Sequence, residues 1–552
     1  MRTPPPDRVA PWATGLVGLL GILSILDATT PPLRPRLHAM AEILPAFVPE
    51  VAGAAAPLGA VLVILSRGLA RRKRRAWAGA LIACLVLVGL HLTAHEPEQA
   101  AGTLVVIGLL LISRPVFAGH PDPRSRTRTV SSFLLSTVFA TVIGIGSLLV
   151  DRDAVKNQLN PPQVLTEVWL GLVGISGPAV FRNGRIQGRI ETTLLLLGVM
   201  VVVATLMVAL RPARGPHHLL PAEADHVRDL LGQNCSDSLS YFALRDDKSV
   251  VFSPSGKAAV AYRVVAGVSL ASGDPLGDPE AWPGAIEAWL TEARRYAWIP
   301  AVLGASEQGA TVYRRHGLDA LELGDEAVVE VDDFALEDRS RRSVRQAAGK
   351  AMRRGYTVTV NRAAELHPVE LERFAHLTAE WRGGQAERGF SMALGRFGDP
   401  RDPGTVIVAC RDESGSVVAI LALVPWNTDG LSLDLMTRAP DAGNGVVELM
   451  VTQLLCKAPA LGVQRVSLNF AVFRAVFERG GKLGAGPVLR LWYRTLMILS
   501  RFWQIESLYR ANAKYQPSWK PRFICFPRAR DLPRISTAAL RAEAFLRLPG
   551  AN

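Results

Sequence analysis

Residues 405–424, TVIVACRDESGSVVAILALV, decide the fold of the C-terminal half of this 552-residue chain. Two apolar runs, 405–410 and 417–424, flank the polar turn RDESGS, and this pattern predicts a β-hairpin. A third strand, a helix and a fourth strand are predicted next, at residues 431–436, 445–458 and 466–470. This order predicts a mixed α/β unit.

A similar order of elements comes earlier in the chain. Residues 249–252 and 258–271 predict strands around a Pro-Ser-Gly turn, and residues 281–296 predict an amphipathic helix. Helices are also expected at residues 341–355 and 369–386. The hairpin, strand, helix and strand resemble an acetyltransferase (GNAT) unit. We therefore expect tandem acetyltransferase-like (GNAT) units at residues 213–336 and 337–552, with the catalytic site in the second.

Long apolar runs fill the chain before residue 211, and several approach the roughly 20 residues that cross a bilayer. They are residues 12–26, 51–65, 76–92, 100–112, 130–150 and 192–210. The first run ends at Asp27 rather than at a small-residue cleavage site, so we expect a retained anchor. Residues 1–212 are therefore expected to form an α-helical membrane bundle of six spans, followed by an α/β cytoplasmic domain.

The distribution of charge predicts the orientation of these spans. Lys and Arg cluster after the second run, between the fourth and fifth runs and after the sixth, whereas the turn after the third run is acidic. The positive-inside rule then places both termini in the cytoplasm of a multi-pass protein of the cell membrane. Residues 164–181 carry Glu167 and a Gly-Pro break, so we expect them to be re-entrant or interfacial. Much of the formal charge of +13 belongs to the loops and is no evidence for RNA binding.

Common catalytic motifs are absent from the sequence. It has no HExxH, GxSxG, Walker A or dinucleotide-binding motif, and its five cysteines form no CxxC pair, so we expect no metal site and no disulfide framework. QAAGKA at residues 346–351 matches the Q-x-x-G-x-A pattern that binds coenzyme A in acetyltransferases. It lies in a basic helix before the predicted strands rather than after the fourth, which disfavours acetyl-CoA.

The run SLYRANAKYQPSWKPRF, residues 507–523, places aromatic residues among cations. Pro517 and Pro521 break any long helix, so we expect Lys514 and Arg522 on a short, rigid and irregular segment. Such a segment suits a phosphate-rich partner.

Four segments carry motifs that are specific as a set: FSMALGRFGD at 390–399, LSLDLMTRAPDAGNGVVELM at 431–450, VSLNF at 466–470 and LYRANAKYQPSWKPRF at 508–523. In this order they resemble the multiple peptide resistance factor family, the aminoacyl-phosphatidylglycerol synthases or phosphatidylglycerol lysyltransferases. The asparagine in YRANAKY is most similar to the actinobacterial branch, in which the module is often fused to a lysyl-tRNA synthetase. Because the chain ends at Asn552, we expect a member without that synthetase.

The resemblance implies transfer of an aminoacyl group, usually lysyl, from its tRNA to a glycerol hydroxyl of phosphatidylglycerol. The product is a cationic membrane lipid. A tRNA ester is already activated, so the reaction needs a base, cations for phosphates and donors for an oxyanion, but no covalent nucleophile and no cofactor. The implied partners are aminoacyl-tRNA, most often lysyl-tRNA, together with phosphatidylglycerol and the bilayer.

The candidate catalytic residues are Asp434, Arg438 and Lys514. Asp434 lies in the apolar strand LSLDLM, where an unpaired carboxylate is costly, so it is either the base or part of a structural ion pair at the strand end. The family has an arginine three positions after this aspartate, but here Thr437 stands there and Arg438 follows. We expect the strand to end at Met436, which lets Arg438 reach a lipid phosphate. The resemblance implies that Lys514 contacts the substrate.

The candidate substrate-binding residues are Arg396, Glu448, Arg522, Arg490 and Arg494. Glu448 is a candidate for the lysyl ammonium, whereas Arg490 and Arg494 lie on an amphipathic helix, residues 488–509, that suits a membrane interface. For each of them the alternative is a solvated or core-packed side chain.

The basic helix at residues 339–354 offers Arg342, Arg345 and Lys350 as tRNA-binding residues, with a solvated helix face as the alternative.

Other functions remain open at this point. No residue determines the amino acid, so alanyl transfer is an alternative to lysyl transfer. A lipid transporter or flippase is disfavoured, because the central stretches of the expected spans carry no charge. A catalytically silent module that binds tRNA or lipid stays open because of Thr437.

Overall fold

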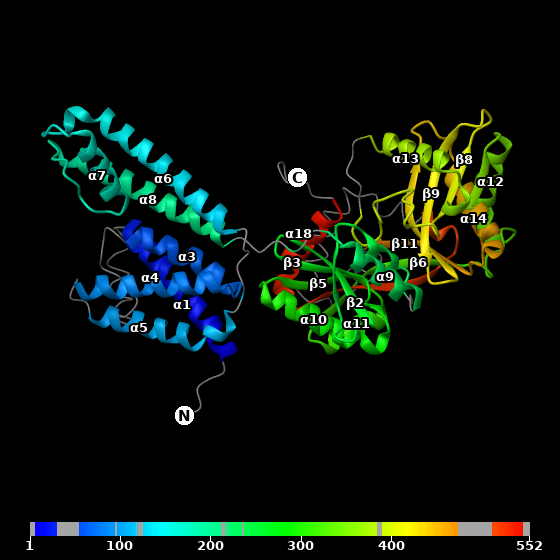
Figure 1. Ribbon diagram of the computed structural model, residues 1–552, viewed down its shortest axis with the longest axis horizontal. Helices are drawn as coiled ribbons and strands as arrows, with labels where there is room; N and C mark the ends of the chain where they lie inside the picture. Colours follow the sequence, from blue (N-terminus) through cyan, green and yellow to red (C-terminus); the bar gives the residue numbers. More distant parts are fainter. Residues whose placement is uncertain are drawn as a thin grey trace, which may run out of the picture. The chain divides into compact units, whose positions relative to one another are not determined.

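The computed structural model describes residues 6–29, 55–93, 97–117, 119, 125–210, 215, 218–233, 237–383, 389–472 and 511–544. These residues form two compact units (Figure 1). The first comprises Met1–Ala213 and Arg294–Ala297, and the second comprises Arg214–Ala293 and Trp298–Asn552.

The first unit is helical. Its helices are α1 (Pro6–Thr29), α3 (Ala55–Ala70), α4 (Arg74–Thr93), α5 (Pro97–Ile112), α6 (Ser125–Val150), α7 (Pro161–Leu172) and α8 (Gly184–Ala209). Helices α1, α3, α4 and α5 bury Leu20, Leu62 and Leu110 in one apolar core. Helices α6, α7 and α8 pack around Leu148 and Leu194 in another.

Two helices of the described chain are long and apolar enough to cross a membrane, at Thr127–Val150 and Gly184–Ala209. Three other apolar helices are shorter, at Val9–Leu23, Leu58–Ala70 and Ala100–Ile112. Helix α6 also exposes large apolar side chains such as Leu135, 71% exposed, and Phe139, 55% exposed. A surface of this kind suits contact with lipid rather than water. By length and composition the structure thus offers two helices that could span a membrane, and the full six-span bundle stays a prediction.

Residues 164–181 do not form a continuous helix, as the Gly-Pro break predicted. Helix α7 ends at Leu172 after 12 residues, or about 18 Å, which is shorter than the bilayer core. The chain then returns along α7, and the buried carboxylate of Glu167 accepts a hydrogen bond from Ala179 N at 2.8 Å. Glu167 therefore holds the return segment to the helix.

The second unit is an α/β domain around one mixed sheet (Figure 1). Its strands are β1 (Ser249–Phe252), β2 (Ala258–Val265), β3 (Val268–Ser272), β4 (Leu276–Gly277), β5 (Ile299–Ala305), β6 (Asp319–Glu330), β7 (Thr357–Arg362), β8 (Val406–Arg411), β9 (Val417–Trp426), β10 (Gly430–Arg438), β11 (Arg465–Val472) and β12 (Ser518–Phe526). Its helices are α9 (Pro221–Gln233), α10 (Trp282–Arg295), α11 (Glu307–Arg315), α12 (Arg342–Arg353), α13 (Pro368–Arg382), α14 (Val446–Lys457) and α18 (Leu532–Ala542).

The hairpin predicted from RDESGS is present as β8 and β9. Asp412 Oδ1 accepts hydrogen bonds from Ser414 N and Ser416 N, both at 2.9 Å, and Gly415 takes a φ of 80° in the turn. These contacts set the register of the two apolar strands, which bury Val408 and Leu421.

The order of strands in the sheet is β1-β2-β3-β5-β12-β6-β11-β10-β9-β8-β7. The unit has two halves, which correspond to the expected units at residues 213–336 and 337–552. In the first half an antiparallel meander ends with β3, which connects through a helix to its parallel neighbour β5. In the second half the meander ends with β10, which connects through a helix to its parallel neighbour β11. The two halves exchange their last strands, because β6 pairs with β11 and β12 pairs with β5. This exchange joins both halves into one sheet and brings the C-terminal motif into its centre.

Three local expectations are corrected by the structure. Residues 518–526 form the central strand β12 rather than an irregular segment, with Pro521 beside a register shift at Arg522 and Phe523. Residues 258–271 are two strands joined by a tight turn, in which Ala266 and Gly267 have positive φ. Strand β10 continues to Arg438, so the expected end at Met436 is wrong.

Candidate functional site

The site lies where the parallel strands β10 and β11 separate. Their register covers three pairs: Gly430 with Arg465, Leu431 with Val466, and Ser432 with Ser467. No further β10–β11 pair follows among the described residues, although both strands continue. We call this point the β10–β11 fork. Past it, neither strand has the other as a backbone partner.

Asp434 lies on a β-bulge directly after the fork. Leu433 pairs with Leu423 of β9 and Leu435 pairs with Ala422, so Asp434 is the extra residue between them. A bulge bends its strand and redirects a side chain, and bulges are frequent at active sites.

The Asp434 carboxylate is half-buried, and its Oδ1 accepts a hydrogen bond from Leu394 N at 2.7 Å. Leu394 belongs to the FSMALGRFGD segment, which lies far from β10 in the sequence. Two of the four motifs therefore meet at this carboxylate. The sequence placed Asp434 correctly in an apolar strand, but it lies in the middle of β10 rather than at the strand end.

Behind the fork lies a buried polar cluster of Ser238, Glu326, Ser432, Ser467 and Arg522, each at most 3% exposed. Ser432 Oγ donates to Ser238 O at 2.7 Å, and Ser467 Oγ donates to Glu326 Oε1. Arg522 Nη2 donates to Ser238 Oγ at 2.7 Å. The cluster thus ties β10, β11, β6 and β12 together beneath the candidate base.

Arg522 is fully engaged inside this cluster. Its Nε donates to Glu326 Oε2 at 3.0 Å, while Nη1 donates to Gly304 O at 3.1 Å and pairs with Asp237 Oδ1 at 2.6 Å. Burial by itself raises the pKa of Glu326, but Arg522 and the serine hydroxyls lower it overall. The guanidinium is therefore an internal counter-ion, which is not the exposed substrate contact that the sequence suggested.

A cavity of about 750 Å³ lies beside Arg522, lined by acidic and basic side chains. Its buried carboxylates include Asp237 and Asp274, while Lys520 and Arg465 also line it. Asp274 accepts a hydrogen bond from Ser306 N, the N-cap of α11, at 2.8 Å, and burial raises its pKa to about 7.

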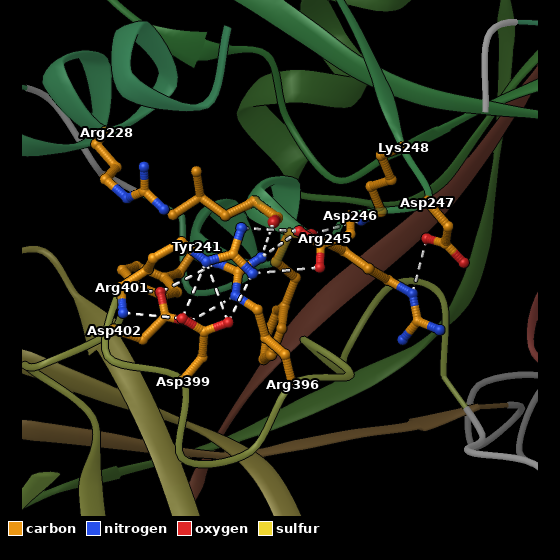
Figure 2. A network of polar contacts seen from close by, with 12 residues as sticks. Arg228, Tyr241, Arg245, Asp246, Asp247, Lys248, Arg396, Asp399, Arg401 and Asp402 are labelled. Atoms are coloured by element: carbon orange, nitrogen blue, oxygen red, sulfur yellow. Dashed lines mark hydrogen bonds and ion pairs between the residues drawn. The ribbon is translucent and has the colours of Figure 1, made fainter. Parts of the chain in front are cut away.

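Arg396 holds together the loop that contacts Asp434 (Figure 2). Its side chain is 8% exposed, its Nε donates to Asp402 Oδ2 at 2.7 Å, and its Nη1 pairs with Asp246 Oδ1 at 3.1 Å and also donates to Leu244 O. These contacts fix the segment 389–402 to residues 244–246 of the other half. Arg396 therefore supports the site rather than facing a substrate.

Lys514 and Glu448 form an ion pair with each other. Lys514 Nζ lies 2.9 Å from Glu448 Oε1, and the two side chains are 40% and 20% exposed. Glu448 lies in the first turn of α14, directly after the β10 segment. The structure brings these two predicted residues together, although as partners of each other.

Thr437 and Arg438 point to opposite faces of β10. Thr437 pairs with Ile420, which packs against α13, whereas Arg438 pairs with Ala419, which belongs to the core beneath α14. The bulge places Asp434 beside Leu435, on the same side as Thr437. Arg438 is exposed at the end of the strand, on the other side from Asp434.

Helix α12 presents part of the expected basic surface. Arg342 and Lys350 are exposed, but Arg345 is half-buried and its Nη1 donates to Leu336 O at 2.8 Å. Arg345 therefore stabilises the preceding loop. The sequence QAAGKA lies inside α12, which confirms that it is not a loop after a fourth strand.

Two predicted residues, Arg490 and Arg494, lie outside the described residues together with the expected helix 488–509. Within the described ranges, no group of three or more His, Cys, Asp or Glu side chains is placed to hold a metal ion. Ser432, Ser467 and Glu326 were not among the residues predicted from the sequence. Their signal is a polar residue inside a strand that is otherwise apolar.

The second unit is thus an α/β domain around one mixed sheet, and the first unit contains two helices that are long and apolar enough to cross a membrane. Residues 227–526 match the family model described as phosphatidylglycerol lysyltransferase, C-terminal, and residues 6–210 match the transmembrane region of lysyl-tRNA synthetase. The chain therefore belongs to the phosphatidylglycerol lysyltransferase family.

Relatives match along nearly the whole chain. The lysylphosphatidylglycerol biosynthesis bifunctional protein LysX of Rhodococcus opacus is 41% identical over 98% of this chain and 49% of its own length. LysX of Mycolicibacterium gilvum is 41% identical over 98% of this chain and 50% of its own length. The chain thus spans about half the length of the curated relatives that it matches.

A solved structure supports the fold of the second unit. L-PGS from Bacillus licheniformis matches 60% of this chain and 99% of its own chain, with 21% sequence identity and a TM-score of 0.52.

Proposed function

We propose that this chain transfers an aminoacyl group from aminoacyl-tRNA to phosphatidylglycerol. The proposed aminoacyl group is lysyl, because the relatives are named for lysylphosphatidylglycerol. Support comes from its membership of the phosphatidylglycerol lysyltransferase family and from relatives named for lysylphosphatidylglycerol biosynthesis. The membrane region fits an acceptor that resides in the bilayer. The single observation that carries the site is the Asp434 carboxylate, held on a bulge at the β10–β11 fork.

Asp434 is the proposed general base. As the glycerol hydroxyl oxygen attacks the ester carbonyl carbon of aminoacyl-tRNA, the carboxylate takes the hydroxyl proton. A C–O bond to glycerol forms, the C–O bond to the terminal ribose breaks, and the departing ribose oxygen takes the proton from the Asp434 carboxyl group, which restores the carboxylate. Backbone N–H groups past the last β10–β11 pair are the candidate donors for the oxyanion.

The buried polar cluster gives this base a fixed support. Arg522 and Arg396 act as positioning residues in the proposal, since Arg522 stabilises the sheet behind the fork and Arg396 stabilises the loop that hydrogen bonds Asp434. The Lys514–Glu448 ion pair at the start of α14 stays a candidate contact for the substrate, because Lys514 is 40% exposed.

The proposed tRNA contact is the exposed basic face of α12. Arg342 and Lys350 lie on this face, and α12 packs through Ala348 and Ala351 against Leu449 of α14. Since α14 directly follows β10, phosphates bound along α12 would lie near the catalytic strand.

The proposed topology is a multi-pass membrane protein with its α/β unit in the cytoplasm. The basic loops of the N-terminal region support it, and so does the donor, because charged tRNA is cytoplasmic.

The test is reconstitution of the full chain in phosphatidylglycerol-containing nanodiscs with lysyl-tRNA, scored by mass spectrometry of the lipids. We expect lysyl lipid only with charged tRNA, and ribonuclease should abolish it. Product made from acetyl-CoA, or alanyl lipid alone from a mixture of charged tRNAs, would contradict the donor or the amino acid.

The Asp434→Asn variant keeps the shape of the side chain and should lower turnover by about 10²-fold or more, as general-base loss does. Asp441→Asn is the matched control, because Asp441 is an exposed carboxylate seven positions further along the same segment. Equal turnover of the two variants would make the Asp434 carboxylate structural.

A further inference from the structure

Asn469 combines two unfavourable features at the β10–β11 fork. Its φ is 72°, in the left-handed region that non-glycine residues seldom occupy. Its side-chain Oδ1 is buried, and none of the described residues donates a hydrogen bond to it. Each feature destabilises the folded state. Strained backbone conformations and buried polar groups without a partner are found most often at functional sites.

The backbone conformation of Asn469 is unusual for its place in the fold. The other non-glycine residues of the described chain with positive φ lie in turns or at element ends: Arg72, Ala266, Ala297, Asn427, Gln516 and Ala544. Asn469 lies inside β11, where the register with β6 shifts between Ser467 and Phe470. The distortion is therefore not explained by a change of chain direction.

The position of Asn469 relative to Asp434 is also informative. Ser432 and Ser467 are the last β10–β11 pair, and Asp434 and Asn469 each follow two positions later. Both residues sit at irregularities of their strands. In addition, Leu468 O accepts a hydrogen bond from Asn512 Nδ2 at 3.2 Å, so a side chain replaces β10 as its partner. Beyond the fork, β10 and β11 thus each carry a polar residue at a backbone irregularity, two positions past their last shared pair.

We infer that Asn469 is a substrate-binding residue whose Oδ1 accepts a hydrogen bond from the bound substrate. The inference rests on the proposed function. Two donor groups are available in that reaction: the glycerol hydroxyl of the lipid and the ammonium of the aminoacyl group. A carboxamide oxygen accepts a hydrogen bond from either group.

The test compares Asn469→Gly with wild type in the full chain. Glycine removes the acceptor and also tolerates positive φ, so the melting temperature should stay equal or rise. Turnover efficiency should nevertheless fall by about tenfold, the usual loss for one uncharged hydrogen bond to a substrate. Higher stability with lower activity is an outcome that a purely structural role would not produce.

Separate titrations identify the donor group. A raised KM for phosphatidylglycerol with an unchanged KM for lysyl-tRNA assigns the glycerol hydroxyl, and the reverse assigns the ammonium. Asn469→Asp keeps an acceptor and tolerates positive φ, so it should recover part of the efficiency lost in Asn469→Gly.

Asn427→Gly is the matched control, since Asn427 has a φ of 56° but lies exposed in the β9–β10 turn. It should leave both KM values unchanged. If Asn469→Gly keeps full efficiency, or if it unfolds while Asn469→Asp restores stability without efficiency, the inference is wrong. If the wild-type chain makes no aminoacyl lipid, the proposed function fails instead.

Discussion

Replacing Arg522 by methionine tests whether this arginine is an internal counter-ion or a lipid contact. Methionine keeps an unbranched chain of similar length but removes the charge and every donor. Asp237, Asp274 and Glu326 then remain as buried carboxylates without the guanidinium that now lies among them. Removal of one partner from a buried ion pair costs about 3–5 kcal/mol.

For a unit of this size, that loss lowers the melting temperature of the α/β unit by roughly 4–7 °C. The assay is thermal unfolding of the full chain in detergent, followed by intrinsic fluorescence. Lys520→Met is the matched control, because Lys520 lies on the same strand, is exposed and lines the same cavity. It should change the free energy of unfolding by less than about 0.5 kcal/mol.

A double variant strengthens the test. Glu326→Gln removes the carboxylate that Arg522 contacts through both Nε and Nη2. The combined loss in Arg522→Met with Glu326→Gln should be smaller than the sum of the single losses by about 1–3 kcal/mol. If Arg522→Met instead melts like Lys520→Met and only raises the KM for phosphatidylglycerol, the internal role is refuted and the lipid contact expected from the sequence is restored.

Three further predictions concern neighbouring residues of the α/β unit. Thr437→Arg places a cation on the Asp434 side of β10 and should keep or raise the turnover efficiency with phosphatidylglycerol, whereas Arg438→Ala should lower it by only a few-fold. The measurement is kinetics with varied phosphatidylglycerol. Activity that appears only in Thr437→Arg would mark the natural chain as catalytically silent. Burial raises the pKa of Asp274 from 3.8 to about 7, so between pH 4 and pH 7 the folded state holds a proton that the unfolded state has lost. The free energy of unfolding should therefore fall as pH rises through this window, by at most about 1.4 kcal/mol per pH unit. Asp274→Asn should flatten the pH 4–7 series of melting temperatures, and an unchanged slope contradicts the assignment. Charge reversal at Arg342 and Lys350 should raise the KM for lysyl-tRNA by about tenfold and leave the KM for lipid unchanged, and equal effects on both would argue against an RNA-binding face.

Local patterns in the sequence determined much of the secondary structure. The RDESGS hairpin, the strand around Asp434 and the helices α10, α12 and α14 all lie close to their expected positions. These elements combine apolar periodicity with clear turn residues, so nearby residues are sufficient to specify them. The apolar composition of the first 210 residues likewise indicated a membrane region, because runs of that length and hydropathy are typical of bilayer spans.

The family was recognised from the sequence by the resemblance that the four motifs carry as a set. The role of each charged residue was not. Arg396 and Arg522 look like exposed cations in a basic segment, yet both are buried ion-pair partners of carboxylates from distant parts of the chain. Burial of a charge depends on partners far away in sequence, and no local pattern reports them.

Only the tertiary structure decided how the two halves combine. Strand β12 was expected to be irregular because of its prolines, but the exchange of β6 and β12 gives it neighbours on both sides. The register of β10 with β11 ends after Ser432 and Ser467, and Asp434 and Asn469 each lie two positions past this end. Sequence alone therefore determined the elements and the family, whereas the site depends on pairings between strands that are distant in the chain.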